Sequence, residues 1–171
     1  MVEMVRTGLR DWIHQDVAAN TEGKSRFVLR GFRLAQRARA GSTPLPRPLE
    51  RLIDRGYRDL TGWFMATELH PDVQAGPGLR IFHCHNVVLN PGARLGARCT
   101  LRTGVCLGNL TDRDGSESGS PELGDEVDVG AGALILGPVR VGHRARIGAG
   151  AVVVRDVPDG ATAVGNPARI L

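Results

Sequence analysis

The sequence predicts a mainly β protein, a parallel β-helix of roughly a hundred residues preceded by a short α-helical segment. Its aliphatic residues recur in strict steps of six, which neither the 3.6-residue period of a helix nor the two-residue period of a simple strand selects. Small or β-branched residues follow four positions later and fix the phase. The first series is Leu123, Val129, Ile135, Val141, Ile147 and Val153, and the second is Val127, Ala133, Val139, Ala145, Ala151 and Val157. Short strands separated by sharp corners explain both series.

Residues 1–67 follow a helical pattern and are expected to form a cap over one open end of the β-helix, where strand edges would otherwise stay unpaired. A first helix is indicated by an apolar stripe, with arginines on its other side that are expected to face solvent. The stripe is Phe27, Val28, Gly31, Leu34, Ala35 and Ala38, and the arginines are Arg26, Arg30, Arg33 and Arg37.

A second helix is expected after the prolines at 44, 46 and 48, because Pro48 suits the first turn of a helix. Its inward-facing residues are expected to be Leu49, Leu52, Ile53, Leu60, Trp63 and Phe64.

The β-helix is expected to span residues 68–171. Upstream the six-residue phase continues through Leu95, Leu101 and Leu107 and, before an eight-residue step, through Ala75, Ile81 and Val87. The stretch before Leu123 is polar and contains glycine but no apolar period, so residues at about 109–121 are expected to form an extruded loop.

Composition limits the function. Hydrophobic residues make up 42% of the 171 residues and aromatic residues only 4%, which suits a narrow aliphatic interior and argues against stacking of nucleic-acid bases. The net charge of +4 arises from 22 basic and 18 acidic residues, a mixed and solvated surface that could still favour a phosphate-rich ligand such as coenzyme A. Because no segment suits a membrane span or a signal peptide, we expect a cytoplasmic protein with three reduced thiols and no nucleic-acid or membrane partner.

Several segments resemble the hexapeptide-repeat acyltransferases: the repeats at 123–133 and 141–153, and Gly-Asn-Pro-Ala-Arg-Ile-Leu at 165–171. Glu-Leu-His-Pro at 68–71, a histidine at 83 and Leu-Gly at 107–108 are most similar to the serine O-acetyltransferase branch. The resemblance covers residues 68–171. It implies a left-handed β-helix, an exception to the usual right-handed crossover, with acetyl-CoA as co-substrate and a homotrimer whose three sites lie between subunits.

His83 matches the catalytic base of that family, and a histidine that titrates near neutrality can accept the proton of a hydroxyl that attacks a thioester. Glu68 matches the acid that orients this base. Cys84 and His85 raise the alternatives of a covalent thioester or a metal site, but adjacent side chains of a strand point to opposite faces. We therefore expect direct acyl transfer without a metal.

The resemblance also implies a coenzyme A channel bordered by small-residue corners and by the C-terminal motif, where Arg169 would offer charge to the phosphates. Backbone amides near Gly108 and Asn109 are candidate oxyanion donors. The residues expected at the coenzyme are Gly108, Asn109, Ala131, Gly132, Ala149, Gly150, Pro167 and Arg169.

The chain departs from the family at the acceptor site. Members that act on serine have an aspartate directly before the histidine and an arginine–histidine pair in the loop, and this chain has Phe82 and Gly119-Ser120 there. Phe82 and, as a substitute anchor, Arg113 are the candidate acceptor contacts.

An O-acetyltransferase acting on a small-molecule hydroxyl is the leading hypothesis. A sugar, polysaccharide or natural-product acceptor is the alternative within enzymes, and a non-catalytic trimeric scaffold is the alternative of another class. Family members that dock on a partner sulfhydrylase use a C-terminal tail ending in isoleucine. This chain ends at Ile170-Leu171, so no such complex is expected.

Overall fold

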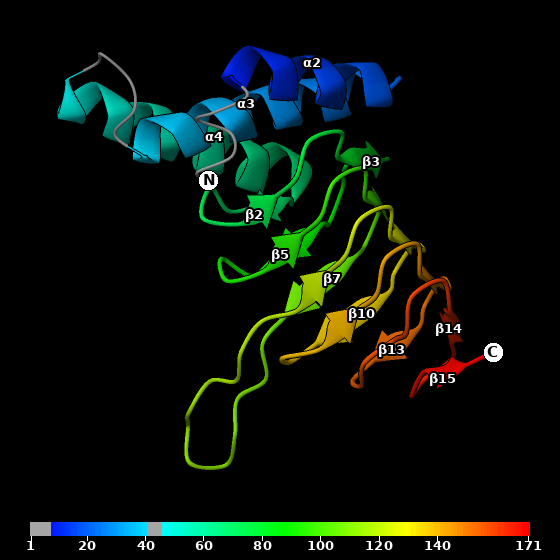
Figure 1. Cartoon of the computed structure of the whole chain (residues 1–171). Coiled ribbons are helices and arrows are strands. Elements are labelled where there is room, and N and C mark those ends of the chain that lie inside the picture. The colour runs from blue at the N-terminus through cyan, green and yellow to red at the C-terminus, as the bar shows by residue number, and fades with distance from the viewer. Residues whose placement is uncertain (1–7, 41–45) are drawn as a thin grey trace.

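The computed structural model describes residues 8–40 and 46–171. Three helices, α2 (Leu9–Ala19), α3 (Gly23–Arg39) and α4 (Arg47–Met65), precede a stack of short strands. The helices lie across one end of the stack, and the coils follow one another away from them toward the C-terminus (Figure 1). None of the described helices is long and apolar enough to cross a membrane.

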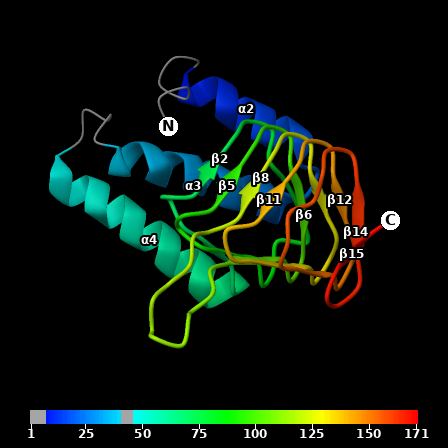
Figure 2. The same ribbon diagram turned by 60° about the horizontal axis from the view of Figure 1, so that its bottom comes forward.

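The strands form three sheets that are the sides of a left-handed parallel β-helix, which confirms the predicted fold class (Figure 2). Sheet A contains β1 (Glu68–Leu69), β4 (Val88–Leu89), β7 (Cys106–Gly108), β10 (Leu134–Leu136) and β13 (Val152–Val153). Sheet B contains β2 (Gln74–Ala75), β5 (Arg94–Leu95), β8 (Glu122–Leu123) and β11 (Arg140–Val141). Sheet C contains β3 (Arg80–Phe82), β6 (Thr100–Arg102), β9 (Asp128–Val129), β12 (Arg146–Ile147), β14 (Thr162–Val164) and the antiparallel β15 (Arg169–Ile170).

The six-residue series faces the interior as predicted. Every member of both series is buried, from Leu123 at 5% exposure to Ile135 at 0%. The register pairs equivalent positions of successive coils, for example Leu107 with Ile135 and Ile135 with Val153. Each aliphatic side chain therefore stacks on its counterpart in the next coil, which is why the repeat is visible in the sequence.

The chain between β7 and β8 leaves the stack. Its residues from Leu110 to Glu117 are exposed, and an isolated antiparallel bridge joins Thr111 to Glu117. Figure 1 shows this segment projecting away from the coils.

The first coil, which contains β1, β2 and β3, has neighbouring strands on one side only, so its other edge faces the helices. Buried side chains of the helical segment bond to that edge. Asn20 accepts from the amide of Ile81 (2.9 Å) and donates to the carbonyl of Leu79 (2.8 Å), and Asp16 accepts from the amide of Leu79 (2.9 Å). Ser25 Oγ donates to the carbonyl of Ile81 (2.6 Å).

Arg33 completes this set, and the prediction that it faces solvent is wrong. Its side chain is fully buried, its Nε donates to Asp16 (2.8 Å), and its two terminal nitrogens donate to the carbonyls of Ala75 and Gly76 (2.7 Å each). The guanidinium also lies over the Trp12 ring, 4.8 Å from its centroid. An arginine fork bonds two adjacent carbonyls and a carboxylate at once, which a purely apolar helix face could not do.

The predicted apolar stripes are partly wrong. Phe27 and Leu34 of α3 are about half exposed, whereas Leu29 and Phe32 are fully buried in the core that the helices share with the coils. On α4 the buried face carries Asp54, Tyr57 and Thr61, and the residues expected to point inward are mostly exposed. The exposed ones are Leu49, Leu52, Leu60, Trp63 and Phe64.

We predict that Arg33→Ala lowers the free energy of unfolding by about 3–5 kcal/mol, because it leaves the buried Asp16 carboxylate and two carbonyls without their partner. Urea denaturation measures the change. Arg30→Ala on the same helix is the control, since Arg30 is exposed and its loss should cost under about 0.5 kcal/mol. Equal stability of the two variants would show that the buried arginine is dispensable.

Candidate active site

His83 and four of the residues expected at the coenzyme lie along the edge where sheet C turns into sheet A, here named the C–A edge (residues 83–87, 103–105, 130–133 and 148–151). Corner residues of successive coils hydrogen-bond to one another along this edge. The amide of Gly104 donates to His85 (3.1 Å), that of Gly132 to Thr103 (2.9 Å), and that of Gly150 to Ala131 (2.8 Å). The C–A edge therefore runs as one continuous column from the helices to the last coil.

His83 lies at the end of this column that is next to the α-helices. It follows β3 in a left-handed backbone conformation (φ 52°), and its side chain is 75% exposed. The Nδ1 atom is 3.0 Å from Glu22 Oε1, and the backbone amide of His83 donates to Glu22 Oε2 (3.1 Å). Within the described part of the chain, Nε2 makes no hydrogen bond to protein, so this nitrogen is free to meet a substrate.

Glu22 is a site residue that the sequence reasoning missed. It directly precedes α3 and lies in a short connection whose neighbours, Asn20 and Ser25, are bonded to β3. Lys24, in the first turn of α3, has its Nζ 3.3 Å from His85 Nε2. The sequence gives only a weak signal for Glu22, which is its place directly before the helix that begins at Gly23. An acidic residue is common at such a position for reasons of capping and helix dipole alone, so it does not indicate a site.

Glu68 begins β1 on the outer face of sheet A and is exposed. Across the described residues its carboxylate takes part in no hydrogen bond or ion pair, and the carboxylate that contacts His83 is that of Glu22. Glu68 instead lines a groove of about 770 Å³ between α4 and sheet A, together with Trp63, Gly108 and Asn109.

The four small residues expected at the coenzyme, Ala131, Gly132, Ala149 and Gly150, all lie on the C–A edge below His83. Gly132 and Gly150 have positive φ values of 68° and 67°, and a Cβ added to either would meet nothing within 4 Å. The edge is therefore narrow and open to solvent, a shape along which a slender chain such as a pantetheine arm can approach backbone atoms.

The C-terminal motif (residues 165–169) bonds to Val152, the residue that directly follows the last corner of the C–A edge. Val152 donates to the carbonyl of Gly165 (2.9 Å), and Ala168 donates to the carbonyl of Val152 (2.8 Å). Pro167 and Arg169 flank Ala168 and are exposed.

Gly108 and Asn109 lie on the opposite side of sheet A, where the chain leaves for the extruded loop. Asn109 Oδ1 accepts from Asn90 Nδ2 (3.1 Å). Gly108 ends the three-residue strand β7, which places it about 10 Å from the C–A edge at 3.3 Å per residue, and Asn109 lies one residue further along. The structure of one chain therefore brings His83 together with the small-residue column but does not bring it together with the proposed oxyanion donors.

The two candidate acceptor residues are also apart. Phe82 lies on the outer face of sheet C beside His83, with the guanidinium groups of Arg80 and Arg102 at 5.8 and 5.7 Å from its ring centroid. Arg102 is in turn paired with Asp128. Arg113 lies in the exposed loop beyond β7.

The thiol next to His83 is buried. Burial raises the pKa of Cys84 to about 11, and the Cys84 side chain points inward while its neighbours point out. A thiol with this pKa is almost entirely protonated near neutrality and is not a nucleophile. No group of three or more His, Cys, Asp or Glu residues that could hold a metal ion occurs in the described segments.

Comparisons with known proteins bear on this site. No protein-family model matches the chain. A curated serine acetyltransferase from Synechococcus elongatus is 41% identical over 123 residues, which cover 72% of this chain and 48% of that protein. The serine acetyltransferase of Helicobacter pylori is 40% identical over 119 residues, covering 70% of this chain and 68% of that protein. The chain belongs to the serine acetyltransferase family.

The fold agrees with this membership. A solved serine acetyltransferase in complex with CoA aligns with a TM-score of 0.80 at 25% identity, covering 98% of this chain and 72% of that one. The chain spans about half the length of the Synechococcus relative. The family resemblance predicted from the repeats and from His83 is thereby confirmed.

Proposed function

We propose that this protein is an acetyl-CoA-dependent O-acetyltransferase in which His83 is the general base. The observation that carries the proposal is the position of an exposed imidazole, with its Nε2 free, at the head of an open column of small residues in a chain of the serine acetyltransferase family. A base at this point can reach a hydroxyl, while the column below leaves room for the thioester substrate.

The chemistry needs one proton relay. As the acceptor oxygen attacks the thioester carbonyl carbon, His83 Nε2 takes the hydroxyl proton. The new carbon–oxygen bond replaces the carbon–sulfur bond, and the leaving thiolate recovers the proton from the imidazolium. Ala131, Gly132, Ala149, Gly150 and the C-terminal residues Pro167 and Arg169 are the proposed coenzyme contacts.

Glu68 is the first residue of β1, at the edge of sheet A next to the helices. The resemblance assigns Glu68 the role of orienting the base. Its carboxylate is exposed, and β1 pairs with β4, the strand that follows the corner holding His83.

The active form is proposed to be a homotrimer with sites between subunits. Gly108 and Asn109 can act as oxyanion donors for a substrate at His83 only if they come from another copy, because sheet A separates the two edges within one chain. The outer face of sheet A suits such a contact. It carries the register-paired, half-buried column Val88, Cys106, Leu134 and Val152.

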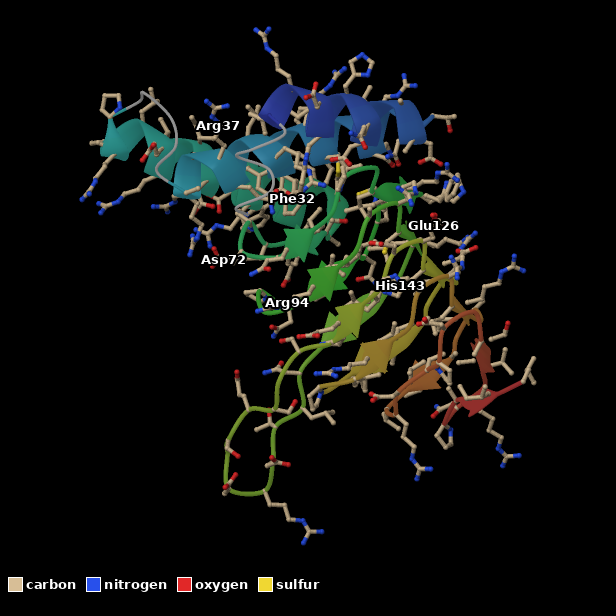
Figure 3. All side chains as sticks on the ribbon, in the orientation of Figure 1. Phe32, Arg37, Asp72, Arg94, Glu126 and His143 are labelled. Carbon is tan, nitrogen blue, oxygen red and sulfur yellow. The ribbon has the colours of Figure 1, made fainter. Side chains whose placement is uncertain are left out.

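The outer face of sheet B is charged, which favours sheet A over sheet B as the proposed interface. Its register-paired residues are Gln74, Arg94, Glu122 and Arg140, all exposed and mostly charged, and Arg94 points outward in Figure 3. Exposed Trp63 of α4 lines the same groove as Val88 and Cys106 and extends the apolar surface.

The proposed acceptor is a small hydroxyl compound, with L-serine as the reference substrate because the relatives are named for it. Phe82 beside the base supplies an apolar surface flanked by two arginines in place of a carboxylate. A less charged or larger acceptor, such as a sugar or a natural-product intermediate, is therefore the second candidate.

We predict that His83→Ala lowers kcat by roughly a hundredfold to ten-thousandfold while the far-ultraviolet circular dichroism spectrum stays unchanged. Release of free CoA with each candidate acceptor measures the rate. His143→Ala is the matched control and should keep the wild-type rate, because this exposed histidine lies beside Asp125 on a different edge of the β-helix. An active His83→Ala protein would end the general-base proposal.

We predict that Leu134→Lys dissociates the trimer, because it places a charge in the middle of the apolar column of sheet A. Sedimentation velocity measures the mass of the assembly, and acetyl transfer should be lost together with it. Glu122→Lys introduces the same side chain on sheet B and should leave the trimer intact. A monomeric, active wild-type protein would refute the intersubunit site.

For L-serine we predict a KM above about 1 mM, the upper end of the ordinary range. Each missing charge-assisted contact to the amino or carboxylate group is typically worth about 1.5–3 kcal/mol. Phe82→Asp, which restores an acid beside the base, should lower this KM, and Phe82→Leu should not. Tight saturation of the wild-type enzyme by L-serine would contradict the argument from Phe82.

A further inference from the structure

The acid that contacts the proposed base comes from the helical segment and not from the β-helix. We infer that Glu22 is a positioning residue for His83, an assignment that rests on the proposed function of His83 as general base. Both carboxylate oxygens of Glu22 are used on this one residue, Oε1 on the ring nitrogen Nδ1 at 3.0 Å and Oε2 on the backbone amide at 3.1 Å. Two contacts from one rigid group fix the imidazole relative to its own backbone.

Glu22 is itself held on both sides. Two residues before it, Asn20 is buried and bonds to Leu79 and Ile81 of the first coil. Three residues after it, Ser25 is buried and donates to the carbonyl of Ile81 at 2.6 Å. The connection from α2 to α3 is therefore attached to β3, the strand that ends directly before His83, so the separation of Glu22 from His83 is set by the backbone of the fold.

The contact determines which nitrogen acts as the base. When Nδ1 carries its proton and donates to a carboxylate, the lone pair of a neutral imidazole is on Nε2, which faces outward. The same carboxylate stabilises the imidazolium that forms during transfer, the role that an acid has beside histidine in hydrolytic triads. Lys24 lies two residues further on but approaches His85 Nε2 at 3.3 Å, so the nearest charge to His83 is that of Glu22.

Two carboxylates can be compared for this role. Glu22 is 31% exposed and in contact with the ring, whereas Glu68 is exposed and makes no side-chain hydrogen bond or ion pair to any described residue. Glu22 therefore holds the ring in the free enzyme. The helical segment then contributes directly to the geometry of the site in addition to covering the end of the coils.

The test reads the tautomer of His83 from long-range ¹H–¹⁵N correlation spectra of the full-length protein labelled at histidine, with the His83 signals identified by their loss in His83→Gln. In the wild-type protein, at a pH where the ring is neutral, the proton is expected on Nδ1. Glu22→Ala is expected to move it largely to Nε2 and to lower kcat at least about tenfold. Glu22→Gln retains an oxygen acceptor and is expected to keep the Nδ1–H tautomer while losing part of kcat with the charge.

Glu68→Ala is the matched control and is expected to leave the tautomer as in the wild type. A wild-type tautomer in Glu22→Ala would overturn the assignment, and a changed tautomer in Glu68→Ala would give the role to Glu68 instead. The spectrum does not depend on turnover. Acetyl transfer that survives His83→Ala would refute the proposed function without altering the tautomer result, so the two failures are distinguishable.

Discussion

The unpaired edge of the first coil is the constraint on which the rest of this structure depends. A parallel β-helix satisfies its backbone by stacking coil on coil, so its first coil has amides and carbonyls with no neighbouring strand. In this protein buried polar side chains of the helices bond to those groups, with Asn20, Ser25 and Arg33 as the principal ones. Because these bonds are directional, they fix the position of the helices on the coil far more closely than apolar contact alone.

The same bonds have a consequence for the site. The connection between α2 and α3 is attached to β3 at Ile81, only two residues before His83, and the carboxylate of Glu22 is thereby carried to the imidazole. The fold and the proposed chemistry thus share one set of contacts. A variant that weakens the bonds between the helices and the first coil is expected to disturb the proposed active site before the distal coils, because the distal coils pair with other coils and not with the helices.

The sequence could predict the β-helix and its inner residues because the repeat is a local property. A side chain such as Ile135 stacks on Leu107 and Val153 at fixed spacing, so the pattern appears in the linear chain. Family membership could be predicted for the same reason, since short motifs carry it, and one of these motifs is the basis for the proposal that His83 is the base. The contacts of Arg33 and Glu22 could not, because their partners are about 40 to 60 residues away and depend on how the helices dock. An arginine stripe on a helix predicts a solvated face, and only the unpaired edge of the first coil makes the burial of Arg33 favourable.

The exposed face of α4 illustrates a different limit. An apolar stripe indicates that a helix face is covered by something, but it does not say by which molecule. Trp63 and Phe64 are 87% and 77% exposed in the single chain, and Trp63 lines the same groove as Val88 and Cys106 of sheet A. The sequence-based expectation that they point into their own chain fails because the buried side of α4 is the one that holds Tyr57, whose hydroxyl donates to the carbonyl of Leu69 (3.1 Å).

Hydrogen exchange of the His83 amide in an Asn20→Ala variant tests most directly the claim that cap anchoring positions the site. If Asn20 holds the connection that carries Glu22, its removal should accelerate exchange at Ile81 and His83 together and leave the amide of Gly150, three coils away along the C–A edge, unchanged. Faster exchange at Ile81 with His83 still protected as in the wild type would contradict the account, because Glu22 would then reach the base without the anchor.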